Sequence, residues 1–224
     1  IIPAQQIWFK ICVSQIETGT PYILYKDAAN RKSNQQHYGT IKSSNLCTEI
    51  IEYSDDKEYA CCTLSSICLP SYVREDKTFD FNKLREVVHV VTKNLNKIID
   101  LNYYPVPETE LSNKRHRPLG IGVQGLADVF INMNIGFDSP EAKQLNKEIF
   151  AVIYYASMEK SLELAKKYKH YETFKGSPLS EGKFQFDLWG VEPIKSVNGL
   201  ELYWNNLREQ IKEHGVYNSL LLAP

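Results

Sequence analysis

Long segments with helical spacing alternate with short apolar segments along this chain, and this alternation constrains the fold more than any other feature. Residues 80–100 carry a single apolar stripe made by Phe81, Leu84, Val87, Val88, Val91, Leu95 and Ile98. A second helical pattern starts at Asp138-Ser139-Pro140, with a capping residue and an early proline, and runs to about Tyr168. Helices interleaved with short apolar strands predict an α/β protein.

Weaker patterns complete the expected organisation. We expect further helices over 3–17, 122–134 and Trp204–His214, and the start of a buried strand at Ser219–Ala223. Two strands, Leu46–Tyr53 and Tyr59–Leu69, are expected to form a hairpin through residues 54–57. Residues 26–44 and 102–118 are expected to be loops, and 172–200 to be loosely structured.

Composition excludes several classes of function. The 26 basic and 27 acidic side chains leave a net charge of −1, which disfavours a general nucleic-acid binder, and no apolar run is long enough to span a membrane. Five cysteines in 224 residues, without a CxxC pair, are typical of reduced thiols in a cytosolic protein rather than of a disulfide scaffold or a zinc site. The first and last residues, IIPAQQIWFK and SLLLAP, look like cuts within a longer chain.

The segment Ser44–Ile50 carries the most reactive chemistry. In an extended backbone alternate side chains share a face, so Asn45, Cys47 and Glu49 would point the same way. A thiol can act as a nucleophile or carry a radical, a carboxylate can take a proton, and an amide can orient a hydroxyl. The alternative is a half-exposed strand that simply has one polar face.

Other candidate motifs are weaker. Cys61 and Cys62 are neighbours in the second predicted strand, so at most one of them can face a site shared with Cys47. Gly120–Gly125 matches GxGxxG, but no strand is predicted before it, which favours close backbone packing at a helix start over a dinucleotide site. The basic run before it, 114–117, is expected to be a solvated loop, His89 a residue at the edge of the core, and no metal site is predicted.

Several strings together resemble the large subunit of class I ribonucleotide reductase, of the eukaryotic or viral type. They are ETGTPYILYKDAANRKSNQQ (17–36), SNLCTEI (44–50), RPLGIGVQGLAD (118–128), NKEIFAVIYYA (146–156) and the GVYN and LAP strings near the end. The resemblance covers essentially all of residues 1–224. It implies that the chain is the central portion of a ten-stranded α/β barrel with a finger loop, with flanking parts of the barrel absent.

The resemblance also implies roles for individual residues. Cys47 corresponds to the cysteine that abstracts the substrate 3′-hydrogen as a thiyl radical. Glu49 corresponds to the base for the 3′-hydroxyl, and Asn45 to the amide that hydrogen-bonds the substrate. Leu46 and Thr48 complete the substrate-binding segment. Cys62 corresponds to one half of a redox disulfide whose partner lies outside this chain, and Cys61 has no assigned role.

Partners follow from the same resemblance. The substrate would be a ribonucleoside diphosphate, and the complete enzyme would need a radical from a metal-containing small subunit, a thioredoxin or glutaredoxin as reductant, and ATP or dNTP effectors. This segment is expected to bind no cofactor of its own. It would belong to a cytoplasmic large-subunit homodimer, inactive without the missing parts. The alternatives are a fragment with only an assembly role and, less favoured, a nucleotide-binding module built on Gly120–Gly125.

Overall fold

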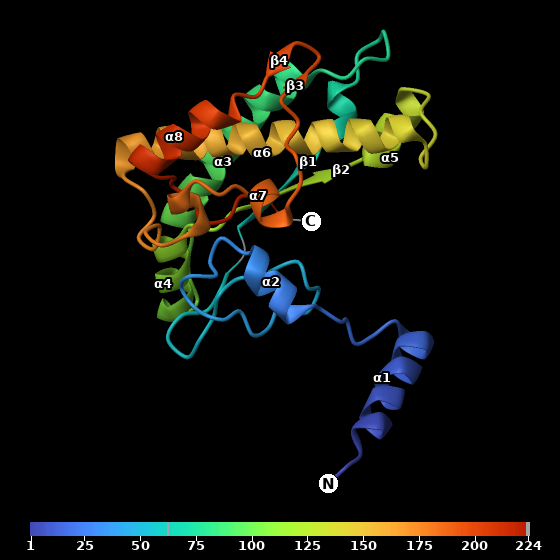
Figure 1. The fold of residues 1–224 in the computed structure, drawn as a ribbon, viewed down its shortest axis with the longest axis vertical. Helices are drawn as coiled ribbons and strands as arrows, with labels where there is room; N and C mark the ends of the chain where they lie inside the picture. Colours follow the sequence, from blue (N-terminus) through green and yellow to red (C-terminus); the bar gives the residue numbers. More distant parts are fainter. Residues whose placement is uncertain (62, 223–224) are drawn as a thin grey trace.

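The computed structural model describes residues 1–61 and 63–222, and Figure 1 shows a body of helices over a small parallel sheet. The α-helices are α1 (Ala4–Thr18), α2 (Lys26–Lys32), α3 (Phe81–Leu101), α4 (Pro107–His116), α5 (Leu126–Asn132), α6 (Pro140–Tyr168), α7 (Gln185–Trp189) and α8 (Trp204–His214). The strands are β1 (Leu64–Cys68), β2 (Gly120–Gln124), β3 (Ser196–Val197) and β4 (Leu200–Glu201), and two short 3₁₀ turns are η1 (Leu69–Tyr72) and η2 (Pro178–Glu181).

Strand β2 lies in the middle of three parallel segments. It pairs with β1 in parallel, with Leu64 opposite Gly120 and Cys68 opposite Gln124. On its other edge, Ile121 forms a parallel bridge with Leu222 and donates its N–H to the Leu221 carbonyl at 3.0 Å. Helices connect each of these segments to the next, in agreement with the predicted α/β class.

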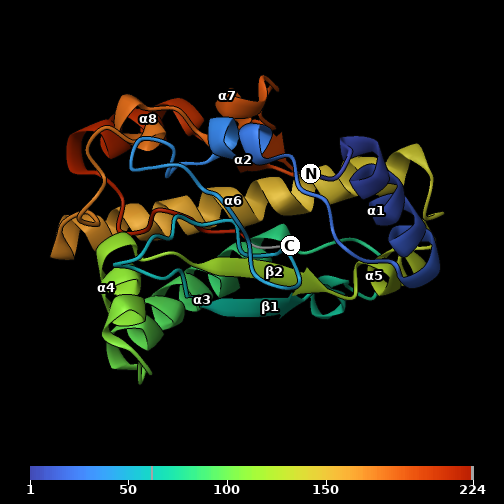
Figure 2. The same cartoon turned by 90° about the horizontal axis from the view of Figure 1, so that it is seen from below.

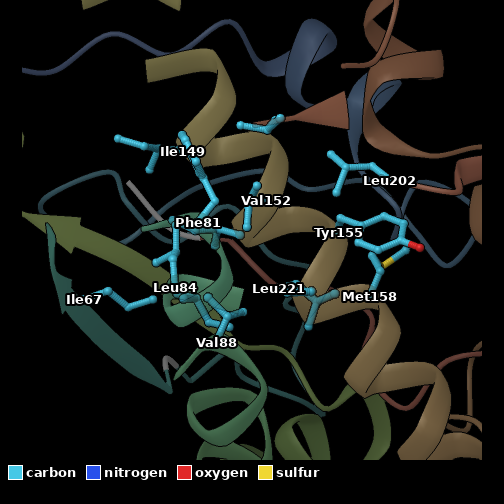
Figure 3. Packing of buried hydrophobic residues seen from close by; sticks show 14 of the residues in the cluster. Ile67, Phe81, Leu84, Val88, Ile149, Val152, Tyr155, Met158, Leu202 and Leu221 are labelled. Atoms are coloured by element: carbon cyan, nitrogen blue, oxygen red, sulfur yellow. The ribbon is translucent and has the colours of Figure 1, made fainter. Parts of the chain in front are cut away.

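The core lies between α3, α6 and the sheet. Leu84 and Val88 of α3 and Ile149 and Val152 of α6 are fully buried, and Figure 3 shows these side chains pointing toward one another beside Ile67 of β1. Each buried aliphatic side chain of this size contributes about 1.5–3 kcal/mol to stability. The pairing of α3 with α6 therefore holds the helical layer together.

The strongly patterned helices form where the sequence predicts them. Asp80 caps α3 by accepting the N–H of Lys83 at 2.9 Å, and Ser139 caps α6 by accepting the N–H of Ala142 at 3.1 Å. Helix α8 has the predicted bounds, and α1 ends at Gly19, whose φ of 74° suits a residue without a Cβ.

The predicted hairpin is wrong. A turn does occur at the expected place, because Asp55 Oδ1 accepts the N–H groups of Lys57 and Glu58. Residues 46–53 form no strand, however, and β1 takes its partner from β2, more than fifty residues further along the chain. Pairing between distant segments leaves no signal in the local sequence, whereas a turn does.

Three further expectations need correction. The predicted loop 26–44 begins with α2, and the predicted excursion 102–118 contains α4. The predicted helix 122–134 is shortened to α5 because residues 120–124 form β2 instead. Helices α2 and α4 are polar and carry no apolar stripe, so hydrophobic periodicity could not reveal them.

Helix α1 stands apart from the rest of the molecule. Figure 1 shows it separated from α2 by an extended segment, and none of its residues is buried. Figure 2, seen from below, shows α1 and α2 above the strands together with α6 and α7. Within residues 1–61 and 63–222, no helix is long and apolar enough to cross a membrane.

Candidate active site

The candidate catalytic residues lie on a tight turn. The N–H of Thr48 is donated to the Asn45 carbonyl at 3.2 Å, and the amide Oδ1 of Asn45 accepts the N–H of Ile50 at 3.0 Å. The Asn45 side chain also donates from Nδ2 to Glu49 Oε1 in a short hydrogen bond. The amide and the carboxylate are therefore held in direct contact, with Cys47 between them in the sequence.

The predicted way of bringing these groups together is wrong. An extended backbone would set residues four apart by about 13 Å, too far for a hydrogen bond. Here Thr48 has a φ of 66°, in the left-handed region, and this reverses the chain between Asn45 and Glu49. A β-branched residue rarely adopts this conformation, so no strand or helix pattern would predict it.

The turn exposes its amide and its thiol, whereas Glu49 is half-buried and its Oε2 is shielded from solvent. The side chains of Asn45, Leu46 and Cys47 are exposed, whereas Ile50 just beyond the turn is buried. Cys47 is a free thiol in no disulfide. The five residues predicted to bind substrate, Asn45–Glu49, therefore lie together on one turn, and their role in binding stays a prediction.

A cavity of about 320 Å³ opens beside this turn. It is lined by Lys42, Ser43, Ser44, Asn45, Ile50, Glu52, Ser54 and Ala60. Although Glu52 as a whole is only partly buried, its Oε2 is shielded from solvent and finds no hydrogen-bond partner among the described residues. Burial raises the pKa of the Glu52 carboxyl from 4.5 to about 8, so this side chain is mostly neutral at pH 7.

A buried ionic cluster lies behind the turn. The carboxylate of Glu58, 1% exposed, accepts from Arg115 Nη1 and from His116 Nε2, each at 3.2 Å. Arg115 Nη1 also donates to the Tyr38 hydroxyl at 2.8 Å, and Nδ1 of His116 contacts the Thr173 hydroxyl at 2.8 Å. The cluster ties the chain that carries the turn to the end of α4.

The protonation of His116 follows from this geometry. Burial lowers the pKa of His116 below its ordinary value, and the nearby Glu58 carboxylate opposes the shift without reversing it. A neutral imidazole satisfies both contacts when Nε2 donates to Glu58 and Nδ1 accepts from the Thr173 hydroxyl. His89, the other histidine discussed from the sequence, is half-buried and contacts Glu159 Oε2 at 3.3 Å, as predicted for an edge residue.

The redox prediction concerns Cys62, which lies outside the described residues. Its neighbour Cys61 is half-buried and close to Tyr104, while Cys68 is exposed at the end of β1. Within the described ranges 1–61 and 63–222, no group of three His, Cys, Asp or Glu side chains is arranged to hold a metal ion.

The GxGxxG stretch serves packing. No strand leads into it, as expected: residues 117–119 are irregular, and Gly120 and Gly122 lie inside β2 and not in a turn. Gly125, with φ of 77°, precedes α5, and a Cβ there would lie 2.6 Å from Pro70 Cδ. Close backbone packing at a helix start, as predicted, is what the structure shows at Gly125.

Sequence reasoning missed the buried cluster, because residues 114–117 were expected to form a solvated loop. His116 and Arg117 are buried, and Arg115 is half-buried. A signal was available: Pro107 and Glu108 open α4, and Lys114, Arg115 and His116 close it, an arrangement that complements the helix dipole. That charge pattern would have predicted α4 without an apolar stripe.

Comparison with known proteins places the whole chain in the family that its sequence resembles. The family model described as "Ribonucleotide reductase, barrel domain" matches residues 1–224. The chain is 58% identical to the ribonucleoside-diphosphate reductase large subunits of Caenorhabditis elegans and Danio rerio, and 54% identical to that of Arabidopsis thaliana. Each alignment covers 100% of this chain and 28% or 29% of the relative.

The chain thus spans a little over a quarter of the length of these relatives. The matched range includes the sheet, the helical layer and the turn that carries Asn45, Cys47 and Glu49. On this evidence, the chain belongs to the ribonucleotide reductase barrel-domain family.

Proposed function

We propose that this chain is the central part of a ribonucleoside-diphosphate reductase large subunit, and that the Asn45–Glu49 turn is part of its active site. The observation that carries the proposal is the contact of the Asn45 amide with the Glu49 carboxylate across an exposed cysteine. The family membership of the whole chain and the names of its relatives support the reaction class. The surrounding fold would be a ten-stranded α/β barrel, and the turn would be the tip of its finger loop.

Each group on the turn has one task in the proposed reaction. Cys47, as a thiyl radical, takes the hydrogen from the 3′-carbon of the ribose and becomes a thiol. Glu49 accepts the proton of the 3′-hydroxyl, and Asn45 hydrogen-bonds the sugar. Glu49 need not be a strong base, because a hydroxyl becomes more acidic once its carbon carries the radical.

The overall change removes the 2′-hydroxyl as water. Two thiols supply the two electrons and two protons, and they leave as a disulfide, so that atoms and electrons balance. Cys62 would be one of these thiols, and its partner would lie outside this chain. An external thiol protein of the thioredoxin or glutaredoxin class would then reduce the disulfide again.

Other chains complete the proposed enzyme. The radical would come from a metal-containing small subunit, and ATP or dNTP effectors would bind elsewhere on the large-subunit homodimer. This segment binds none of these cofactors in the proposal. Its contribution is the turn, the cavity beside it and the scaffold that holds both.

The test is the Cys47→Ser variant of the complete large subunit, assayed with its small subunit for the reduction of CDP. Turnover should fall to background, because the O–H bond of serine is much stronger than the S–H bond of cysteine and does not yield a radical in its place. Cys68→Ser, which removes another exposed free thiol, is the matched control and should keep wild-type turnover. CDP reduction that survives in Cys47→Ser would instead favour a purely structural role for this segment.

A further inference from the structure

The segment that carries the candidate active site is held to the rest of the molecule where it begins and ends, and not at the turn in its middle. We define the site loop as residues 39–52 and its base as the two flanking segments, 33–38 and 53–58. The tip at Asn45–Cys47 is exposed and bonds within the loop itself. Besides two hydrogen bonds between the backbone of Ile41 and the side chain of Asn30 in α2, the polar contacts that place the loop lie at its base.

The two sides of the base are bonded to each other. Gln35 is 2% exposed, and its Oε1 accepts the N–H of Tyr53 at 2.8 Å. The rings of Tyr38 and Tyr53 meet edge to face, with centroids 4.9 Å apart. Gly39 lies so close to the Tyr53 ring that a Cβ there would be 2.1 Å from it. The two ends of the site loop therefore lie side by side and in contact.

The base is fastened to the scaffold by the ionic cluster. Glu58 closes the base, and its buried carboxylate contacts both Arg115 and His116 at the end of α4. The His116 ring also packs edge to face on Tyr38, at 4.8 Å between centroids, so both sides of the base meet this histidine. Gln35 Nε2 adds a bond to the Ser219 hydroxyl at 3.2 Å, just before the chain pairs with β2.

A buried carboxylate suits this task better than an apolar contact would. An apolar side chain can slide on its neighbours, whereas Glu58 Oε2 is restrained by directional contacts from a guanidinium and an imidazole, and the buried Oε1 has no hydrogen-bond partner among the described residues. Removing the carboxylate would leave the half-buried Arg115 with Tyr38 and Glu172 as its remaining partners, and His116 without an acceptor for Nε2.

We propose that Glu58 is a positioning residue of the active site: through Arg115 and His116 it fixes the base of the site loop and thereby the place of Cys47. This inference rests on the proposed function of the turn. Hydrogen transfer to a thiyl radical requires near contact between sulfur and carbon, and a displacement of about 1 Å can slow such a step about a hundredfold. Substrate binding draws on several groups and is less sensitive to the same displacement.

The chain offers a matched control. Glu159 of α6 likewise lies between an arginine and a histidine: Oε1 accepts from Arg85 Nη2 at 2.6 Å, and Oε2 contacts His89 at 3.3 Å. This second triad joins α3 to α6 and does not contact the site loop. Substitutions at Glu159 therefore remove the same chemical groups and the same kind of ion pair elsewhere in the molecule.

The experiment compares Glu58→Ala and Glu58→Gln with Glu159→Ala in the complete large subunit. We expect Glu58→Ala to lower kcat about tenfold or more with less than about a threefold change in KM. Glu58→Gln, which keeps an acceptor for His116, should recover part of the loss, and Glu159→Ala should keep wild-type kcat. A kcat for Glu58→Ala within twofold of the Glu159→Ala value would overturn the proposal.

A second measurement does not depend on turnover. Hydrogen–deuterium exchange of the backbone amides of residues 39–52 should be faster in Glu58→Gln than in the wild type, and unchanged in Glu159→Gln. Equal exchange in the two variants would refute the positioning role of Glu58 even if Glu58→Ala did not fold.

The Cys47→Ser variant distinguishes failure of this inference from failure of the proposed function. If Cys47→Ser remains active, the proposed function fails. If Cys47→Ser is inactive but Glu58→Ala has normal kinetics, only the role of Glu58 is refuted.

Discussion

Thr48 shows how one residue shapes the candidate site. Its φ of 66° lies in a region that costs a β-branched residue roughly 1–2 kcal/mol, and the hydrogen bonds of Asn45 to Glu49 and Ile50 compensate for this strain. Glycine adopts the same φ without strain but also adopts many others. The rigid turn therefore depends on a residue that is locally unfavourable and restricted in its conformations.

Replacing Thr48 with glycine separates stability from activity. Thr48→Gly should not lower the melting temperature, because the strain is relieved. It should lower kcat in the complete enzyme several-fold, about as expected when a reacting group loses its fixed orientation. Asparagine tolerates positive φ better than threonine but is less free than glycine, so the kcat of Thr48→Asn should lie between those of the wild type and Thr48→Gly. An activity for Thr48→Gly equal to the wild type would contradict this role for the turn.

Glu52 makes the stability of the protein depend on pH. Its folded pKa of about 8 exceeds the ordinary value of 4.5, so between these values the folded chain holds a proton that the unfolded chain has released. Stability from this group is therefore complete at low pH and declines as pH rises toward 8, by up to about 1.4 kcal/mol per pH unit.

Glu52→Gln removes this dependence. The melting temperature of the variant should increasingly exceed that of the wild type as the pH rises from 5 to 8. Thermal unfolding at several pH values measures the difference, and Glu75→Gln, at an exposed position, controls for the loss of one negative charge. Parallel curves for Glu52→Gln and the wild type would show that the carboxyl is solvated.

At the scale of elements, a buried polar network joins the two main helices to the last parallel segment. The amides of Asn96 in α3 and Asn218 donate to each other at 3.1 and 2.9 Å. The second Nδ2 proton of Asn218 goes to the Arg117 carbonyl, and its Oδ1 also accepts from Ser161 of α6. All four hydrogen-bonding positions of the Asn218 amide are therefore used inside the core.

Asn218→Ala should destabilise the protein strongly. It leaves buried groups on α3 and α6 without partners, and the expected loss of unfolding free energy is roughly 3 kcal/mol or more. Asn205→Ala, on an exposed position of α8, should have almost no effect. Denaturant unfolding of both variants tests the difference, and comparable losses would mean that the network contributes little.

The limits of sequence reasoning also lie at this scale. Helices α3, α6 and α8 were predictable because each combines an apolar stripe with a start or stop signal, whereas α2 and α4 have no stripe. The SNLCTEI string singled out the candidate site residues, whose role stays a prediction, but it could not reveal the contact between Asn45 and Glu49, which depends on the unusual φ of Thr48. In the cluster around Glu58, this residue contacts Arg115 and His116, which follow it in the sequence by 57 and 58 positions. No local sequence pattern encodes contacts over such a separation.

At the scale of the whole molecule, α1 leaves a large apolar surface uncovered. Its exposed side chains include Ile7, Trp8, Phe9, Val13 and Ile16. The outer edges of β1 and of residues 220–222 likewise have no strand beside them within the described parts of the chain. Exposed apolar patches and open strand edges both promote association.

The isolated 224-residue chain should therefore self-associate. Light scattering at increasing concentration should show species larger than a monomer, and Trp8→Lys combined with Phe9→Lys should reduce their size. Val90→Lys combined with Ile98→Lys, at exposed apolar positions of α3, adds the same charge away from α1 and should have a smaller effect. A monodisperse monomer with a sharp cooperative melt would contradict the expectation.

The hydrogen bond between Asn45 and Glu49 also acts as an internal competitor for any ligand that binds the turn. A ligand that displaces this hydrogen bond must offer a partner to each of the two side chains. One that offers a partner to only one leaves the other unpaired and forfeits about 1.5–3 kcal/mol, which is about a tenfold or greater loss of affinity. If the turn binds such a ligand, it should favour one with a partner for both side chains over one with a partner for only one of them.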